Sequence, residues 1–96
     1  DVGISENANT RPPAQLTIHP NPANTWVTFD YDILVPPTDA FIIIRDQQGR
    51  EVYRMKLLVQ KNEVVWDTRG VGSGTYVVTL TNKSRDLRTE KLVIQR

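Results

Sequence analysis

Carboxylates are the main candidates for acid–base chemistry in this 96-residue chain, since it carries 11 Asp and Glu, one His and no Cys. Without Cys, neither a disulfide framework nor a thiolate metal site can form. The single imidazole, His19, has no second His or Cys with which to share a metal ion, so it is expected to be an ordinary surface residue. The residue types therefore predict no metal site, no cofactor and no catalytic residue, and hence no enzyme.

Two pairs of carboxylates come closest to an arrangement for acid–base catalysis. Asp30 and Asp32 lie on one face of an expected strand, and Asp39 and Asp46 flank a run of apolar residues. Such catalysis needs one carboxyl group in an apolar pocket while a second stays ionised, and these polar surroundings near turns do not favour that. The D-x-D-x-D-G spacing of a calcium loop does not occur either. These carboxylates are therefore expected to lie on the surface and to cap turns.

A glycine-rich segment at residues 70–74 invites comparison with phosphate-binding loops. The dinucleotide-binding fingerprint G-x-G-x-x-G would require glycine at position 75 and a helix after it, but Thr75 stands there and a strand-like run follows. Ser73 is not in a G-x-S-x-G nucleophile motif, because Val71 occupies the position of the first glycine. The segment is expected to be a turn between two strands.

Charge and apolar runs exclude two further classes of protein. With 12 Lys and Arg the net charge is +1, which argues against a nucleic-acid-binding protein, because such proteins concentrate basic charge on one face. The longest apolar run, residues 40–44, has five residues, whereas a transmembrane helix needs about 20. The sequence starts at Asp1 and shows no signal peptide, so the chain is expected to be part of a larger precursor.

The composition indicates β-strands rather than helices, because Val, Ile and Thr number 11, 7 and 10 against 4 Ala. Strands are therefore expected to position any functional site. Branched side chains of this kind pack well on a pleated sheet and lose rotamer freedom in a helix. Apolar residues also alternate with polar ones, as in Val27, Phe29 and Tyr31. Seven strands are predicted, at residues 16–18, 26–31, 40–45, 52–59, 63–67 and 75–80 and in a last strand where Leu92 and Ile94 share a face. Short strands separated by turns indicate an all-β, two-sheet antiparallel sandwich.

The pattern also predicts which residues lie inside the sandwich. The run 40–45 is apolar on both faces, as in a central strand, and Trp66 is expected in the core while Trp26 is expected to be exposed. In the strand 52–59, Tyr53, Met55, Leu57 and Val59 are expected on one face, with Arg54 and Lys56 on the other. Residues 1–15 are polar and lack periodicity, which predicts a flexible tether before a domain at 16–96.

The end of the chain permits two interpretations. Arg85, Arg88, Lys91 and Arg96 are interleaved there with acidic residues. A mixed-charge edge strand commonly discourages aggregation between sheets. A terminal edge strand can equally be captured by a receptor that adds a strand to it. Spacing alone does not decide between them.

Turn sequences at residues 3–6, 16–24, 46–52, 67–78 and 91–94 occur in an order that resembles the C-terminal sorting domain of cargo secreted by the type IX system of Bacteroidota. The residues that carry this resemblance at turns and motifs are Pro20, Asn21, Pro22, Gly49, Arg50, Asp67, Gly74 and Tyr76. The chain departs from the family's usual residues at His19, Arg69 and Val71. The resemblance implies a seven-stranded immunoglobulin-like antiparallel β-sandwich.

The resemblance also implies a function, which is a non-catalytic sorting signal that directs a larger N-terminal passenger through the type IX outer-membrane translocon. Cargo of this kind crosses the periplasm and reaches the outer-membrane surface or the medium, and a sortase-like peptidase usually removes the domain. The tether at residues 1–15 is the region in which such a cleavage site would lie. Residues expected to contact the translocon are Lys91, Leu92, Val93, Ile94 and Arg96. The alternative is an immunoglobulin-like accessory or carbohydrate-binding module of an extracellular enzyme, in which Trp26 would stack on a sugar.

Overall fold

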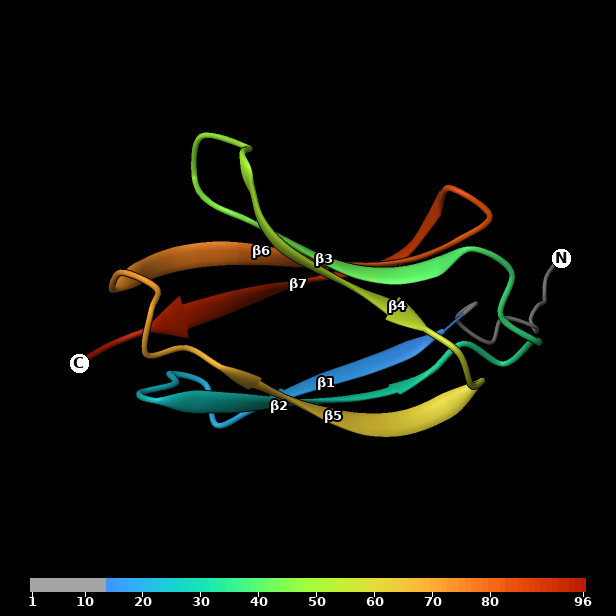
Figure 1. The fold of residues 1–96 in the computed structure, drawn as a ribbon, viewed down its shortest axis with the longest axis horizontal. Helices are drawn as coiled ribbons and strands as arrows, with labels where there is room; N and C mark the ends of the chain where they lie inside the picture. The colour runs from blue at the N-terminus through green and yellow to red at the C-terminus, as the bar shows by residue number, and fades with distance from the viewer. Residues whose placement is uncertain (1–13) are drawn as a thin grey trace, which may run out of the picture.

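The computed structural model describes residues 14–96, and these residues form strands and turns with no helix (Figure 1). The seven strands are β1 (Gln15–His19), β2 (Trp26–Asp32), β3 (Ala40–Arg45), β4 (Glu51–Leu57), β5 (Lys61–Asp67), β6 (Gly74–Asn82) and β7 (Arg85–Ile94). The predicted all-β fold with seven strands is confirmed. The described residues contain no helix of the length and apolar character that crossing a bilayer requires.

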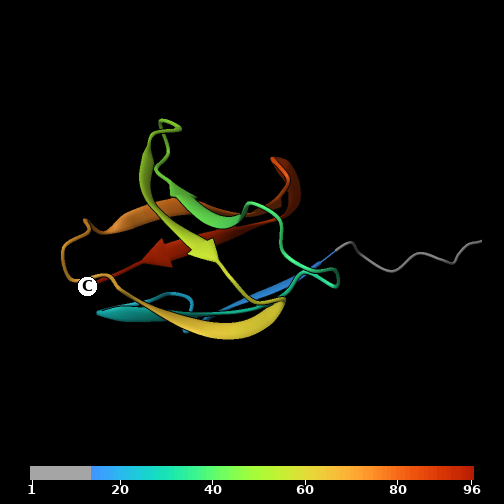
Figure 2. The same cartoon turned by 45° about the vertical axis from the view of Figure 1, so that its right-hand side comes forward.

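Two antiparallel sheets lie face to face, with the order β1-β2-β5 in one and β4-β3-β6-β7 in the other (Figure 1). The strand β3 is flanked on both sides, which confirms the central position predicted from its two apolar faces. In constant-type immunoglobulin domains the fourth strand joins the sheet of the first two. Here β4 pairs with β3 instead, and the chain then crosses to β5 in the other sheet (Figure 2).

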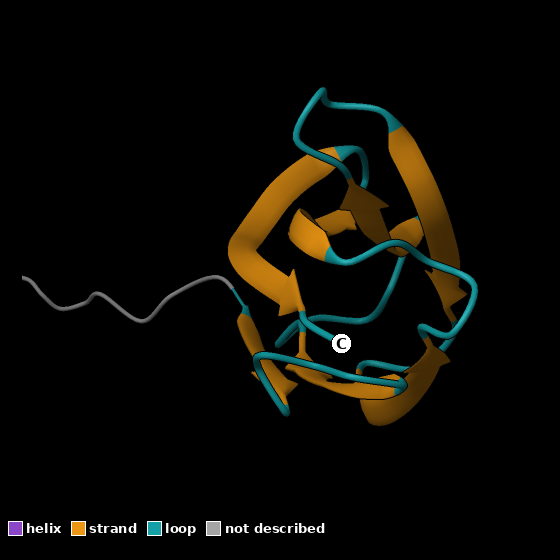
Figure 3. Ribbon diagram, turned by 90° about the vertical axis from the view of Figure 1, so that its left-hand side faces the viewer, coloured by secondary structure: helices purple, strands orange, loops and turns teal. Residues whose placement is uncertain are grey.

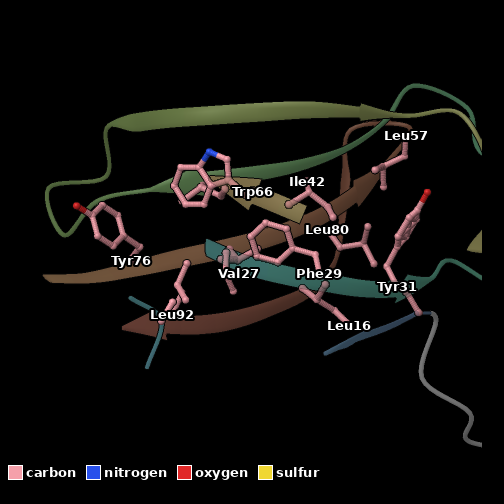
Figure 4. Packing of buried hydrophobic residues seen from close by; sticks show 14 of the residues in the cluster. Leu16, Val27, Phe29, Tyr31, Ile42, Leu57, Trp66, Tyr76, Leu80 and Leu92 are labelled. Atoms are coloured by element: carbon pink, nitrogen blue, oxygen red, sulfur yellow. The ribbon is translucent and has the colours of Figure 1, made fainter. Parts of the chain in front are cut away.

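The core lies between the sheets and is built from the inward side chains of both (Figure 4). Strict alternation along β2 turns Val27, Phe29 and Tyr31 inward, and all three are buried. Opposite them lie Ile42, Val78, Leu80, Leu92 and Ile94, which are less than 2% exposed. Burying one such aliphatic side chain contributes about 1.5–3 kcal/mol, so this layer dominates the stability of a domain that has no disulfide.

Trp66 is in the core, as predicted, and it links the two sheets. Its ring stacks on Phe29 of the neighbouring strand with centroids 6.4 Å apart, and on Tyr53 of the opposite sheet at 5.5 Å. Tyr53 remains partly exposed because it covers the open side between β4 and β5. Figure 4 shows the indole between the layers.

The fourth strand is shorter than predicted, since it ends at Leu57 rather than at residue 59. Leu58 is 78% exposed and Val59 also lies at the surface, so the prediction that Val59 shares a strand face with Leu57 is wrong. The physical reason is the crossing to the other sheet, which must be completed before β5 starts at Lys61. The carbonyl of Val59 accepts a hydrogen bond from the hydroxyl of buried Tyr31 at 2.9 Å.

The turn before the last strand is short. Only Lys83 and Ser84 connect β6 to β7, with φ angles of 55° and 63°. Asn82 is buried just before them, and its side-chain oxygen accepts the main-chain N–H of Thr38 at 2.7 Å. The Asn-Lys-Ser tripeptide therefore offers no accessible amide for glycosylation in the folded domain.

The folded part already includes the end of the predicted tether. Ala14 is buried and Gln15 opens β1. The rest of the tether lies outside the residues that the structure describes.

Candidate functional site

Three segments that are far apart in the sequence meet at the end of the sandwich where the chain terminates. They are residues 20–25 after β1, residues 67–72 after β5, and residues 91–96 at the end of β7. Figure 1 shows these segments together on the left, and Figure 3 looks onto this end. We call it the terminal end. It contains four of the eight residues that carry the family resemblance, namely Pro20, Asn21, Pro22 and Asp67, so the geometry of their contacts defines the candidate site.

Asn21 joins the first of these segments to the last strand. Its Nδ2 donates to the main-chain oxygen of Lys91 at 2.8 Å, and its Oδ1 accepts the N–H of Val93 at 3.0 Å. Ala23 continues the contact through its main chain, donating to the oxygen of Val93 and accepting from Gln95, both at 2.8 Å. Residues 21–23 thus act as a short piece of parallel strand on β7, which we call the edge clip.

The edge clip occupies main-chain groups that an edge strand normally leaves open. The main-chain N–H and C=O groups of successive strand residues point to alternate sides of the strand. Those of Lys91, Val93 and Gln95 point toward the outer edge of β7. The clip bonds to all three. A receptor strand could therefore not pair with this part of β7 without displacing residues 21–23. The peptide bonds before Pro20 and Pro22 in this segment are both cis.

A second set of contacts joins the last residue to the loop after β5. The guanidinium of Arg96 donates to the main-chain oxygens of Thr68 and Val71. Thr68 is fully buried, and its hydroxyl and N–H donate to the oxygens of Asn24 and Thr25, both at 2.9 Å. The three segments are therefore bonded to one another in a closed cycle, and they form one surface.

The glycine-rich loop of residues 70–74 lies in this surface and leads into β6, as predicted. The hydroxyl of Tyr76 donates to the oxygen of Gly72 at 2.6 Å and holds the loop against the sandwich. Gly74 has a φ of 153°, at the limit of what other residues adopt.

Asp67 and Arg69 form a bidentate ion pair on the outside of this loop. Nε and Nη2 of Arg69 donate to the two carboxylate oxygens of Asp67, the shortest distance being 2.7 Å. These side-chain hydrogen bonds, together with one from the Arg69 main chain, lower the pKa of Asp67 to about 2. Arg96 lies close enough to lower this pKa further by its charge. The carboxylate thus stays ionised, and it cannot act as a general acid near neutral pH.

Trp26 lies beside this ion pair on the outer face of the three-stranded sheet. It is 47% exposed, as its position in the alternating pattern predicted. A pocket of about 440 Å³ is lined by Thr25, Trp26, Val65, Asp67 and Arg69. The outer face of β2 and β5 therefore offers an apolar hollow with a charged rim.

The residues predicted to contact the translocon divide into two groups. Leu92 and Ile94 are buried in the core, whereas Lys91 is exposed and Val93 is partly so. Arg96 is exposed, although its guanidinium is engaged by the loop carbonyls. Only three of the five side chains thus face outward, and translocon contact by these residues stays a prediction.

The remaining motif residues shape a turn. Gly49 has a φ of 85° in the β3–β4 hairpin, which confirms the predicted turn. Asp46 organises this hairpin by accepting the N–H groups of Gln48 and Arg50 and the Nε of Arg50. Desolvation raises the pKa of Asp46, but these hydrogen bonds outweigh that effect, so the pKa lies below its ordinary value.

One group of side chains could hold a divalent cation. His19, Asp30 and Glu63 come from three adjacent strands, and their ligand atoms lie within 4.8 Å of one another. Sequence reasoning did not bring them together, because the register of β1 and β5 on β2 was needed to do so. All three are exposed, and they lie on the outer face of the smaller sheet.

Sequence reasoning also did not identify the edge clip. Asn21 and Pro22 were expected to shape a turn, and nothing in the spacing indicates that a side chain at position 21 bonds to a strand 70 residues later. The one available signal was that residues 16–24 and 91–94 both carry the family resemblance.

Comparison with protein-family models matches residues 17–95 to the family described as the secretion system C-terminal sorting domain. Comparisons with curated proteins and with solved structures found no match. The match covers the described sandwich except for a few residues at its two chain ends, and it includes the edge clip and the glycine-rich loop. The chain therefore belongs to the family of type IX secretion C-terminal sorting domains.

Proposed function

We propose that this domain is the sorting signal of a larger N-terminal passenger, and that the terminal end is the part that the type IX translocon reads. The observation that carries the proposal is the closed cycle of contacts among residues 20–25, 67–72 and 91–96. A signal that depends on three separate segments is presented only when the domain is folded, which suits an address that must be read at the end of transit.

Lys91, Val93 and Arg96 make the contact with the translocon through their side chains. Leu92 and Ile94 serve the same contact indirectly, because their burial holds β7 in place beneath the exposed residues. This group contains both cationic and apolar side chains. It therefore suits a protein surface as binding partner better than a purely anionic surface.

The domain does no chemistry of its own in this scheme. A sortase-like peptidase separates it from the passenger within the predicted tether, and the passenger then stays at the outer-membrane surface or is released. The low pKa of Asp67 agrees with a structural ion pair at the terminal end rather than with acid–base catalysis.

A reporter fusion tests the function directly. Residues 1–96 are placed after a passenger with a Sec signal peptide and expressed in a type IX-competent bacterium. The reporter is expected at the cell surface or in the medium. Retention of the folded fusion in the periplasm would overturn the proposal.

Two controls make the result specific. The same fusion in a strain without a working type IX translocon should stay in the periplasm. A passenger with the Sec signal alone should also stay there in the competent strain. Equal export in both strains would show that the domain acts by another route.

A further inference from the structure

An apolar patch interrupts the polar outer face of the three-stranded sheet. Elsewhere this face carries exposed polar residues such as His19, Asp30 and Glu63. At the terminal end it carries Trp26 and Val65, which are 47% and 66% exposed. The register sets them side by side, since Trp26 pairs with Asp67 and Thr28 with Val65. A large aromatic and an exposed aliphatic residue beside a pocket are typical of an interaction surface.

The rim of this patch is cationic on the side of the loop after β5. Arg69 and Arg96 approach it from the loop after β5 and from the chain end, and the acidic group facing them is Asp67. On that side two guanidinium groups face one carboxylate, whereas Glu63 and Asp30 lie on the same sheet face beyond Val65 and Thr28. We call Trp26, Val65, Arg69 and Arg96 the Trp26 patch. Trp and Arg are also the residue types that contribute most to binding at protein interfaces.

The edge clip restricts how a partner can bind nearby. Because residues 21–23 already bond to Lys91, Val93 and Gln95, this stretch of β7 offers no free ladder for an added strand. A partner at the terminal end must therefore bind side chains. These are Lys91 and Val93 on the outer face of the larger sheet, and the Trp26 patch, which includes Arg96, on the side of the smaller sheet.

We propose that the outer-membrane partner of this domain is a protein that docks on the Trp26 patch, with an apolar group seated beside Trp26 and carboxylates facing Arg69 and Arg96. The inference rests on the proposed sorting function and deepens it, because it names the surface and the chemistry of the partner. Complementary charge speeds the encounter and makes it sensitive to salt.

The test uses the full 96-residue chain and outer-membrane vesicles from a type IX-competent bacterium. Wild-type chain should bind these vesicles and not vesicles from a strain without the translocon. Trp26→Ala should weaken binding by roughly tenfold or more. Arg69→Glu should weaken it to a similar extent at low salt, and the difference should shrink at high salt.

Matched variants control for exposure and for ion pairing. Leu58→Ala removes a more exposed apolar side chain far from the patch, and Arg54→Glu breaks a similar surface pair with Glu51. Both should bind as wild type. Thermal unfolding of every variant checks that lost binding is not lost folding.

A cross-link gives a second, independent readout. The chain contains no Cys, so Val65→Cys carries a single photoreactive probe in the middle of the patch. A translocon-dependent protein adduct is expected from position 65 and not from Leu58→Cys.

The outcomes distinguish failure of docking on the Trp26 patch from failure of the sorting function. If wild type binds only translocon-containing vesicles and folded Trp26→Ala binds equally well, the patch is overturned and the sorting function stands. If wild type shows no translocon dependence, the sorting function itself fails. If purified cell-surface polysaccharide alone reproduces the Trp26-dependent binding, the partner is a glycan and the protein partner is overturned.

Discussion

Asn21 and Lys91 are 70 positions apart in the sequence, yet the side-chain amide of the first donates to the main-chain oxygen of the second at 2.8 Å. The same side chain accepts the N–H of Val93. One residue of the first turn thus closes the edge of the last strand, which would otherwise be open to other chains. The family motif around Asn21 and the one at the chain end are parts of one structural unit.

The first prediction concerns this side chain. Asn21→Ala removes two exposed hydrogen bonds and should lower the free energy of unfolding by about 1–2 kcal/mol, or the melting temperature by roughly 4–15 °C. Asn21→Asp should cost more at pH 7, because a carboxylate only accepts and would face the oxygen of Lys91. Acidification should recover part of that loss by restoring a donor.

Thermal melting by circular dichroism at pH 7 and pH 3 measures both variants. Asn62→Ala, an exposed asparagine on β5, is the matched control and should change little. A melting temperature of Asn21→Asp equal to that of wild type at pH 7 would contradict the double hydrogen bond.

Much of the sandwich follows from local patterns in the sequence. Residues 40–45 are apolar on both faces, which predicted the central strand, and alternation along 26–31 predicted an exposed Trp26 above a buried Val27. These features depend on each residue and its near neighbours. The crossing after Leu57 does not, because residues 52–59 continue an alternating pattern that only the position of the second sheet interrupts.

The candidate site depends on long-range geometry, so little of it was predictable. The edge clip requires that residues 21–23, after β1, lie along the edge of β7. The group of His19, Asp30 and Glu63 requires the register of three strands. Spacing along the chain carries neither kind of information. The family resemblance compensated in part, because it marked the segments that later proved to be in contact.

The second prediction separates packing from contact in the last strand. Leu92 is fully buried, so Leu92→Ala should destabilise the domain by about 2–5 kcal/mol and abolish export by unfolding it. Lys91 is exposed, and Lys91→Glu should change stability by less than about 0.5 kcal/mol. If Lys91 contacts the translocon, this folded variant should nevertheless be exported poorly.

Reporter export and thermal melting are measured on the same fusions. Lys56→Glu, a charge reversal on exposed β4, is the control for net charge. Normal export of Lys91→Glu would remove this side chain from the contact, whereas a stable Leu92→Ala would contradict its place in the core.

The third prediction concerns the turn between β6 and β7. Lys83 and Ser84 both have positive φ, the combination of a type I′ turn, for which Asn-Gly is preferred. A left-handed backbone conformation costs a residue with a Cβ roughly 1–2 kcal/mol. Glycine avoids this cost, but part of the gain is lost because glycine has more conformational entropy in the unfolded state. The double variant Lys83→Asn, Ser84→Gly should therefore melt several degrees higher, since about 1 kcal/mol corresponds to 4–8 °C.

Gly49→Ala is the matched control, for which the expected change in melting temperature has the opposite sign. Its φ is 85°, and a Cβ there would meet nothing within 4 Å, so only the backbone conformation opposes the change. It should lower the melting temperature. A turn variant that melts below wild type would contradict the left-handed assignment at positions 83 and 84.

The last prediction is a pH dependence at the terminal end. Side-chain and main-chain hydrogen bonds from Arg69 hold the pKa of Asp67 at about 2 against an ordinary 3.8. A folded-state pKa below the unfolded value means that the pair stabilises the domain above about pH 4 and that this contribution is lost as the pH falls toward 2. Arg69→Ala should move the pKa of Asp67 up toward its ordinary value, which a carboxylate-detected NMR titration measures. The melting-temperature difference between wild type and Arg69→Ala should accordingly shrink below pH 4, while the pKa of Asp46 stays low in both proteins because Gln48 and Arg50 hold it there. A difference that is independent of pH would show that the ion pair contributes nothing through its charge.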